Sequence, residues 1–232
     1  MKEIFRKVPF LRSAKIHLWR LIFRKQERER EIASIVLPPL SRDVRKALVL
    51  QEMSFRSPAA GVIVECGVAT GKSLGILGLV SDKKIYGFDS FEGFPKGTDK
   101  DSKSFSPDKK WLYKLMDVDV ARNNIVQMGI KPADIDSRIF FVKGFFPESF
   151  KGFKEEVALL HLDVDLYQSY KDCLSHFFPL LAKGGVILFD EYDHPKTLQK
   201  WPGAKIAIDE FVSEHNLSIQ RHWSGFVYVQ KP

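Results

Sequence analysis

The chain has 232 residues, of which 44% are hydrophobic, and a formal net charge of +7. This length and apolar content suffice for one sizeable hydrophobic core. Its two cysteines are too few for a disulfide framework or a cysteine-rich zinc site, which favours a reducing, cytoplasmic location. Residues 1–30 carry ten Lys or Arg against three Glu, and the remaining charges sum to zero. The composition therefore disfavours nucleic-acid binding by the whole protein.

The N-terminal arm, residues 1–35, interleaves basic residues with apolar ones, among them Leu18, Trp19, Leu21, Ile22 and Phe23. It has no run of ~20 apolar residues, so we expect it neither to span a bilayer nor to direct export. Two interpretations stay open. The arm is an amphipathic helix that packs on the domain or on a second subunit of a homo-oligomer, or residues 1–30 contact the inner face of an anionic membrane peripherally. We expect residues 36–232 to form one domain.

The next elements alternate between helical and strand-like patterns. Residues 41–53 predict a helix with Ser41 at its N-cap. Segments 71–80 and 167–181 are helical, and the strand-like apolar runs cover residues 61–65, 84–89, 138–143, 157–163 and 185–190. Strand, helix and strand in alternation predict an α/β fold with a Rossmann-like, doubly wound, mostly parallel sheet.

The C-terminal part departs from this alternation. After a helix over about residues 203–215, segments 217–223 and 226–230 flank Ser224-Gly225 and predict a hairpin that adds an antiparallel strand. Residues 91–110 have no periodic pattern and are rich in Lys, Asp, Ser and Gly. Because this segment follows a strand end that should face a ligand, we expect it to act as a lid.

The stretch ECGVATGKSLG, residues 65–75, is similar to two phosphate-binding motifs and matches neither. Three residues separate Gly67 from Gly71, where a Walker loop needs four, and Ala69 replaces the middle glycine of the dinucleotide fingerprint. Asp89 lies 22 residues after Gly67, about where an acid reaches the ribose hydroxyls of a bound nucleoside. With Glu65 before the turn, the pattern indicates an adenosine-type cofactor without phosphates there, such as S-adenosylmethionine.

A third segment, residues 144–146, follows the predicted strand 138–143 at the same edge of the sheet. Phe145 and Phe146 either offer an apolar wall to adenine or belong to the core. The full set of candidate cofactor-binding residues is Glu65, Cys66, Gly67, Gly71, Ser73, Asp89, Ser90, Gly144, Phe145, Phe146 and Asp163.

Acidic residues end several of the predicted strands. Asp163 and Asp190 end two strands joined by a helix, so we expect their carboxylates side by side at the ligand-binding edge. Carboxylate oxygens there suit Mg²⁺ or another divalent cation. A bound cation would lower the pKa of an acceptor hydroxyl, so that a carboxylate takes its proton before methyl transfer. His194 is a further candidate catalytic residue, whereas His161 alternates within a strand and is interpreted as structural.

The motifs VECGVATGKS, FDSFEGFP, HLDVDLYQS, GGVILFDEY and PGAKIAIDEF follow one another over about residues 60–215. With these motifs in this order, the chain resembles the macrocin O-methyltransferase-like enzymes. These are metal-dependent sugar O-methyltransferases that use S-adenosylmethionine. The resemblance implies a class I methyltransferase fold and an acceptor that is a sugar or a glycosylated small molecule. It also implies cofactor contacts at Glu65, Gly67 and Asp89, metal ligation by Asp163, Asp190 and Glu191, and Asp163 as the catalytic base. The family often has Asp-Asp-Tyr where this chain has Asp190-Glu191-Tyr192, which leaves the ligand role of Glu191 open.

Two other functions stay open. A metal-dependent glycosyltransferase would use Asp163-Val164-Asp165 as its D-x-D motif, but the glycine turn, Glu65 and Asp89 have no place in that account. A non-catalytic, membrane-associated binding protein would use the basic arm and a decayed cofactor site. The intact acids at the strand ends argue against the second alternative.

Overall fold

The computed structural model describes residues 40–58, 60–102 and 116–232. The predicted N-terminal arm lies outside these residues, as do residues 103–110 of the expected lid. Within the described part of the chain, no helix is both long enough and apolar enough to cross a membrane.

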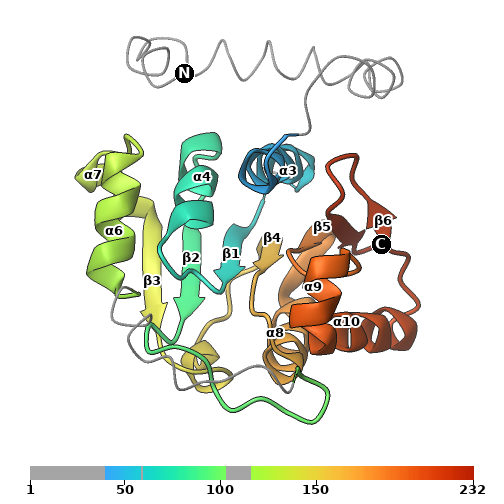
Figure 1. Cartoon of the computed structure of the whole chain (residues 1–232). Helices are drawn as coiled ribbons and strands as arrows, with labels where there is room; N and C mark the ends of the chain where they lie inside the picture. The colour runs from blue at the N-terminus through green and yellow to red at the C-terminus, as the bar shows by residue number, and fades with distance from the viewer. Residues whose placement is uncertain (1–39, 59, 103–115) are drawn as a thin grey trace. The chain divides into compact units, whose positions relative to one another are not determined.

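A seven-stranded sheet forms the centre of the domain, with strand order β3-β2-β1-β4-β5-β7-β6 (Figure 1). Five strands run parallel: β1 (Val62–Cys66), β2 (Ile85–Asp89), β3 (Ile139–Lys143), β4 (Val157–Leu162) and β5 (Leu181–Phe189). Two more, β6 (Gln220–Arg221) and β7 (Val227–Gln230), form an antiparallel hairpin, and β7 pairs with β5. The predicted mostly parallel sheet with a C-terminal antiparallel strand is thus confirmed.

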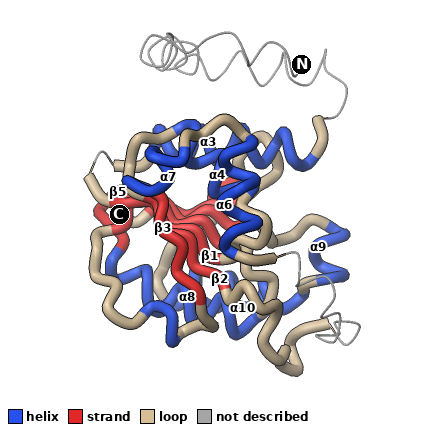
Figure 2. Tube along the Cα trace, turned by 90° about the vertical axis from the view of Figure 1, so that its left-hand side faces the viewer, coloured by secondary structure: helices blue, strands red, loops and turns tan. Residues whose placement is uncertain are grey.

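Helices cover both faces of this sheet (Figure 2). One face carries α3 (Arg42–Arg56), α4 (Lys72–Val80), α6 (Val118–Gln127) and α7 (Pro132–Arg138). The other carries α8 (Tyr167–Leu180) and α10 (Pro202–Glu214), with α9 (Pro195–Lys200) before α10 and a 3-10 turn, η3 (Glu148–Phe150), before β4. The four helices that the sequence predicts are confirmed as α3, α4, α8 and α10.

The sequence patterns did not indicate α6, α7 and α9, because these helices bury few side chains. Only Ala121 and Ile125 are buried in α6, only Ile135 in α7, and none in α9. A short helix with so few apolar positions has no clear 3.6-residue period. Strand β5 also begins at Leu181, four residues before the predicted 185, and its N-terminal part includes Gly184.

Two hydrophobic clusters, one on each face of the sheet, make up the core. Residues of α8 and α10 pack with one cluster, and residues of α3, α4, α6 and α7 pack with the other. Every residue of β1 is buried, as expected for a central parallel strand covered on both faces. Glu65 is the one charged side chain in this strand. Because β1 lies between β2 and β4, the chain reverses its winding direction beside β1, which is where open α/β sheets bind ligands.

The described part of the expected lid is fastened to the rest of the domain. Asp101 is buried; its carboxylate accepts hydrogen bonds from the Thr98 amide at 2.7 Å and from the Tyr167 amide at the start of α8, at 2.9 Å. Gly203 of α10 packs against the same carboxylate so closely that an added Cβ would lie 2.3 Å from Asp101 Oδ1. Residues 90–102 (green in Figure 1) therefore run past the strand ends as an anchored segment.

Candidate active site

The glycine turn after β1 passes against the end of β4 without room for a side chain. Gly67 has a φ of 88°, and a Cβ built on it would lie 2.0 Å from the carbonyl oxygen of Asp163. The Gly67 amide donates to the carbonyl of Phe88 at 2.8 Å, and the Asp163 amide donates to the carbonyl of Cys66 at 3.0 Å. This turn thus joins the ends of β1, β2 and β4, and only glycine fits at position 67.

The carboxylate of Asp89, at the end of β2, holds the same turn in place. Its Oδ2 accepts hydrogen bonds from the amides of Val68 and Ala69, both at 2.8 Å. Its Oδ1 accepts a third from the amide of Phe91, also at 2.8 Å. Ala69 has a φ of 47°, which is uncommon for a residue with a side chain. Asp89 therefore fixes the backbone of the turn, a role that its predicted ribose contact did not anticipate.

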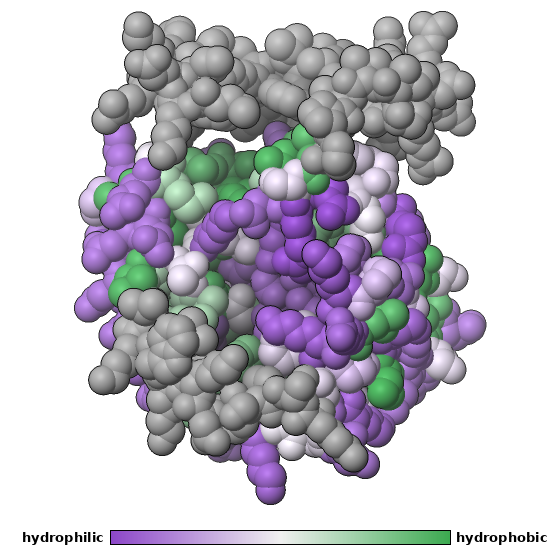
Figure 3. Space-filling view, in the orientation of Figure 1, coloured by the Kyte–Doolittle hydropathy of each residue, from purple (hydrophilic) through white to green (hydrophobic). Residues whose placement is uncertain are grey.

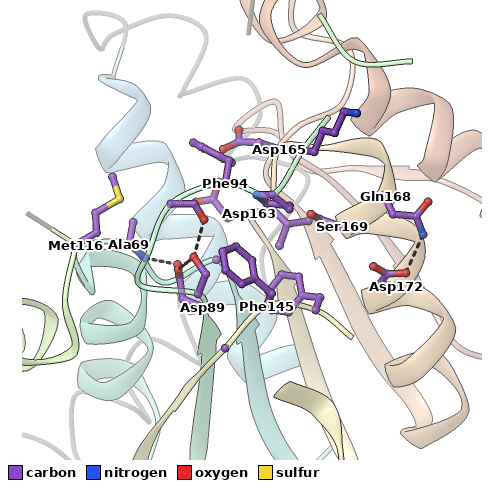
Figure 4. Close-up of a pocket in the computed structure, with 18 residues that line it drawn as sticks. Ala69, Asp89, Phe94, Met116, Phe145, Asp163, Asp165, Gln168, Ser169 and Asp172 are labelled. Carbon is purple, nitrogen blue, oxygen red and sulfur yellow. Dashed lines mark hydrogen bonds between the residues drawn. The ribbon is translucent and has the colours of Figure 1, made fainter. Parts of the chain in front are cut away.

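A cavity of about 980 Å³, counting its open mouth, lies at this edge of the sheet. We call it the cofactor cavity; its lining includes Gly67, Asp89, Ser90, Gly144, Phe145, Phe146 and Asp163 from the predicted set. In the view of Figure 4, Asp163 lies between Asp89 on the glycine-turn side and Ser169 on α8. Figure 3 shows a recess bordered by hydrophilic residues near the centre of the face seen in Figure 1.

Four residues of the predicted cofactor set do not line this cavity. Glu65 and Cys66 are fully buried within β1, while Gly71 and Ser73 lie at the start of α4, in the buried turn. Their contact with a cofactor stays a prediction. Eleven lining residues were not in the predicted set, among them Phe94, Met116, Asp165, Gln168, Ser169 and Asp172. Asp165 could have been found from the D-x-D motif, and Gln168 and Asp172 from their i,i+4 spacing on α8.

Glu65 contacts a histidine instead of the cavity. Glu65 and His161 are register partners on β1 and β4, and Glu65 Oε1 lies 2.8 Å from His161 Nδ1. Both side chains are fully buried. Burial raises the pKa of the Glu65 carboxyl above its ordinary value, although the hydrogen bond with His161 opposes this shift. The pair lies directly beneath the glycine turn and the end of β4.

Four carboxylates gather where β4 and β5 end; we call Asp163, Asp165, Asp190 and Glu191 the acidic cluster. Asp163 follows β4 and Asp190 follows the neighbouring β5, which confirms the predicted side-by-side placement. Oxygen atoms of Asp163, Asp165 and Glu191 lie within 4.8 Å of one another, as do ligand atoms of His161, Asp163 and Asp190. Asp165 has a φ of 62°, a left-handed backbone that is uncommon for a residue other than glycine.

Two cations from α3 meet the acidic cluster. Lys46 Nζ lies 2.5 Å from Asp163 Oδ2 and 2.8 Å from Asp190 Oδ1. Arg42 forms a short hydrogen-bonded ion pair with Asp190, and its Nη2 lies 3.9 Å from Glu191 Oε1. Sequence reasoning missed these contacts, because α3 precedes β4 by more than a hundred residues.

The pKa values of the acidic cluster shift in two directions: that of Asp190 is lowered, whereas those of Asp163 and Glu191 are raised. Burial would raise the pKa of Asp190, but Lys46 and Arg42 hold it well below its usual range. Burial raises the pKa of Glu191 well above its ordinary value, and the charges of Asp190 and Asp163 add to the rise. The Tyr170 hydroxyl also donates to Glu191 Oε2 at 2.8 Å. Burial likewise raises the pKa of Asp163, and Asp190 adds to it.

The donor set suits a hard divalent cation. Its atoms are carboxylate oxygens on two adjacent strand ends, which is the chemistry that Mg²⁺ and similar ions prefer. Asp163 belongs to two sets of close ligand atoms, with His161 and Asp190 in one and with Asp165 and Glu191 in the other. The three predicted ligands Asp163, Asp190 and Glu191 do not all fall in one set, and their joint ligation of a metal ion stays a prediction.

The predicted catalytic residue His194 lies apart from the cofactor cavity. It precedes α9 as its N-cap residue, is exposed, and lines a smaller second cavity together with Arg42, Arg45, Asp190 and Phe226. Asp190 thus borders the second cavity while Asp163 borders the cofactor cavity. A catalytic role of His194 stays a prediction.

Comparisons with known proteins agree with this architecture. Over 81% of this chain and 80% of the other, the structure matches that of the O-methyltransferase NovP with a TM-score of 0.63 and 22% sequence identity. The doubly wound sheet with its closing antiparallel strand, and a ligand cavity at the β1 edge, define a class I methyltransferase fold.

Sequence comparison identifies the family within this class. Residues 49–223 match the macrocin-O-methyltransferase (TylF) family, so the chain belongs to that family. The mycinamicin III 3''-O-methyltransferase of Micromonospora griseorubida is 27% identical over 72% of this chain, and the demethyldecarbamoylnovobiocin O-methyltransferase of Streptomyces niveus is 28% identical over 68%. These matches span 66% and 60% of the two relatives' own lengths.

Proposed function

We propose that this protein is an S-adenosylmethionine-dependent and divalent-cation-dependent O-methyltransferase that acts on a hydroxyl of a sugar or a glycosylated small molecule. The observation that carries the proposal is that Asp163 lines the cofactor cavity and also belongs to the acidic cluster. A methyl donor and an acceptor hydroxyl could therefore meet at one carboxylate. The family membership and the acceptors named for the two relatives support the same reaction and substrate class.

The lining of the cofactor cavity suits a methyl donor built on adenosine. The backbone at Gly67 leaves room for a ligand's amino-acid end, and Asp89 and Ser90 offer polar atoms to ribose hydroxyls. Phe145, whose side chain is 40% exposed, and the neighbouring Phe146 offer an apolar surface to a base. Arg and Lys side chains that would pair with phosphates are few in this lining, where Lys96 is the one cation among the described residues.

At the acceptor hydroxyl, Asp163 would take the proton while the cavity holds the donor's methyl group in line. When bound, the divalent cation would lower the pKa of that hydroxyl and neutralise the charge that develops on its oxygen. Asp163 lines the cavity, so its carboxylate is placed to accept the proton of an acceptor hydroxyl that enters it. Asp190 keeps its negative charge, as a cation ligand must. His194 could take the proton if the acceptor enters through the second cavity.

Calorimetric titration with S-adenosylhomocysteine, compared with ATP, NAD and a UDP-sugar, tests the proposal. We expect S-adenosylhomocysteine alone to bind in the micromolar range, because the lining offers few cationic partners for phosphates. Tight binding of the UDP-sugar with no binding of S-adenosylhomocysteine would favour the D-x-D glycosyltransferase instead. Binding of none of them would favour the non-catalytic alternative.

Four further expectations belong to this proposal. We propose a domain boundary near residues 35 and 36, a cytoplasmic location, and an arm that contacts either protein or the inner face of a membrane. A homo-oligomer is the protein partner that the first alternative implies. Co-sedimentation with anionic liposomes, comparing the full chain with a form lacking residues 1–30, separates the alternatives, because equal pelleting of both forms rules out membrane contact by the arm.

A further inference from the structure

Lys46 lies between the carboxylates of Asp163 and Asp190, two of the predicted ligands of a divalent cation. Its side chain is only 12% exposed, and its Nζ contacts both Asp163 Oδ2 and Asp190 Oδ1, at 2.5 and 2.8 Å. Arg42 lies four residues earlier on α3, so both cations project from the same side of the helix. The guanidinium of Arg42 covers the other oxygen of Asp190. Two strand-end carboxylates are thus paired entirely with cations from one helix.

These ion pairs stabilise a cluster that would otherwise be strongly repulsive. Carboxylates that are taken out of water beside one another raise the free energy of the folded state unless a cation neutralises them. Burial alone would lower the pKa of Lys46, but Asp163 and Asp190 raise it above its ordinary value, so the ammonium stays charged. Lys46 and Arg42 therefore act as resident counter-ions of the acidic cluster.

A divalent cation and the Lys46 ammonium compete for the same oxygen atoms. Carboxylate oxygens bind Mg²⁺ at about 2.0–2.1 Å and larger divalent ions at up to about 2.6 Å. An ammonium at hydrogen-bond distance from these oxygens would lie next to the ion and repel it. We propose that a divalent cation binds the acidic cluster only by displacing Lys46, together with Arg42, so that α3 sets the affinity of the site for metal. This inference rests on the proposed divalent-cation dependence.

Titration of the full chain with Mn²⁺ alone, followed by the electron paramagnetic resonance signal of the free ion, tests the exchange. Lys46→Gln removes the competing charge, and we expect it to lower the Kd for Mn²⁺ by roughly tenfold or more. Lys72→Gln is the matched control, because Lys72 also pairs with an acid of α3, Asp43, at 2.5 Å, but contacts no member of the acidic cluster. We expect its Kd to equal that of the unchanged protein.

Thermal unfolding distinguishes a change in metal binding from poor folding of the variant. Without metal, Lys46→Gln leaves Asp163 and the buried Asp190 without the Lys46 ammonium, so we expect a lower Tm than for the unchanged protein. Saturating Mg²⁺ should raise the Tm of Lys46→Gln more than that of the unchanged protein, because tighter binding stabilises more. Lys46→Arg keeps the positive charge and should retain the weak Mn²⁺ affinity.

Equal or weaker Mn²⁺ binding by folded Lys46→Gln would overturn the exchange and leave the proposed methyl transfer intact. If no protein in the series binds Mn²⁺, the exchange and the divalent-cation dependence both fail. The titration with S-adenosylhomocysteine, performed without metal, would then decide on the methyl donor separately.

Discussion

The two halves of the ligand-binding edge are stabilised by different interactions. At the ends of β1 and β2, the glycine turn is fixed by hydrogen bonds between backbone amides and Asp89, and its shape depends on close backbone packing. At the ends of β4 and β5, the carboxylates of Asp163 and Asp190 are held by Lys46 and Arg42 from a distant helix. The first half is thus held by hydrogen bonds and packing of its own backbone, whereas the second half is neutralised by side chains from elsewhere in the fold.

The largest effect is expected at the residue that both halves share. Asp163→Asn should lower kcat by about 10²–10⁴-fold, because it removes the proposed proton acceptor and a cation ligand. Affinity for S-adenosylhomocysteine in calorimetry should change by no more than a few-fold. Asp136→Asn is the control, since Asp136 forms an exposed ion pair with Arg122 on the far helices. Unchanged turnover of Asp163→Asn, or undiminished activity in chelator, would contradict the assigned role.

Gly67→Ala tests the backbone packing of the first half. The left-handed φ and the contact with the Asp163 carbonyl should together cost about 3 kcal/mol or more of unfolding free energy, measured with urea. Binding of S-adenosylhomocysteine should be lost. Gly152→Ala has a similar φ of 87° with no atom within 4 Å of the added Cβ, and should cost only about 1–2 kcal/mol. Equal losses of unfolding free energy for the two variants would show that close packing at the turn contributes nothing to stability.

Asp89→Asn tests the hydrogen bonds of the same half. The amide side chain has one accepting oxygen in place of two, so at least one of the amides of Val68, Ala69 and Phe91 loses its acceptor, at a cost of about 1–3 kcal/mol. Asp117→Asn is the control. Asp117 caps α6 through the Val118 amide, and Asn caps helices about as well as Asp. If Asp89→Asn and Asp117→Asn lower the unfolding free energy by the same small amount, the hydrogen bonds of Asp89 do not fix the turn.

The smallest effect is expected in the pH dependence of stability at Glu65. Its pKa is raised in the folded protein, so the carboxyl binds its proton more tightly when folded than when unfolded. The contribution of Glu65 to the free energy of unfolding is therefore fully present below the unfolded pKa of about 4.3 and is lost as pH rises through the higher folded pKa. Glu65→Gln should flatten that part of the curve of unfolding free energy against pH. An unchanged slope would show that Glu65 titrates normally.

Much of the first half was predictable because its determinants are close in sequence. The spacing from Gly67 to Gly71 disfavoured a phosphate loop, and the spacing from Gly67 to Asp89 predicted an acid beside the turn. The residues that bond Asp89 lie only 21 and 20 positions before it or 2 after it. The role of Glu65 was harder to predict. Its contact with His161 depends on the register between β1 and β4, which a single strand's sequence does not specify.

The sequence by itself determined the strands, their order of alternation with helices, and the acids that end them. Apolar periodicity and strand-terminal acids are local properties, so they can be found before the chain is folded. Only the tertiary structure decided what neutralises those acids. Residues 41–53 predict an amphipathic helix, but nothing in them indicates that Lys46 reaches Asp163, 117 positions away. Charge pairing across such a distance depends on how helix and sheet pack, and that packing arises only when the whole domain folds.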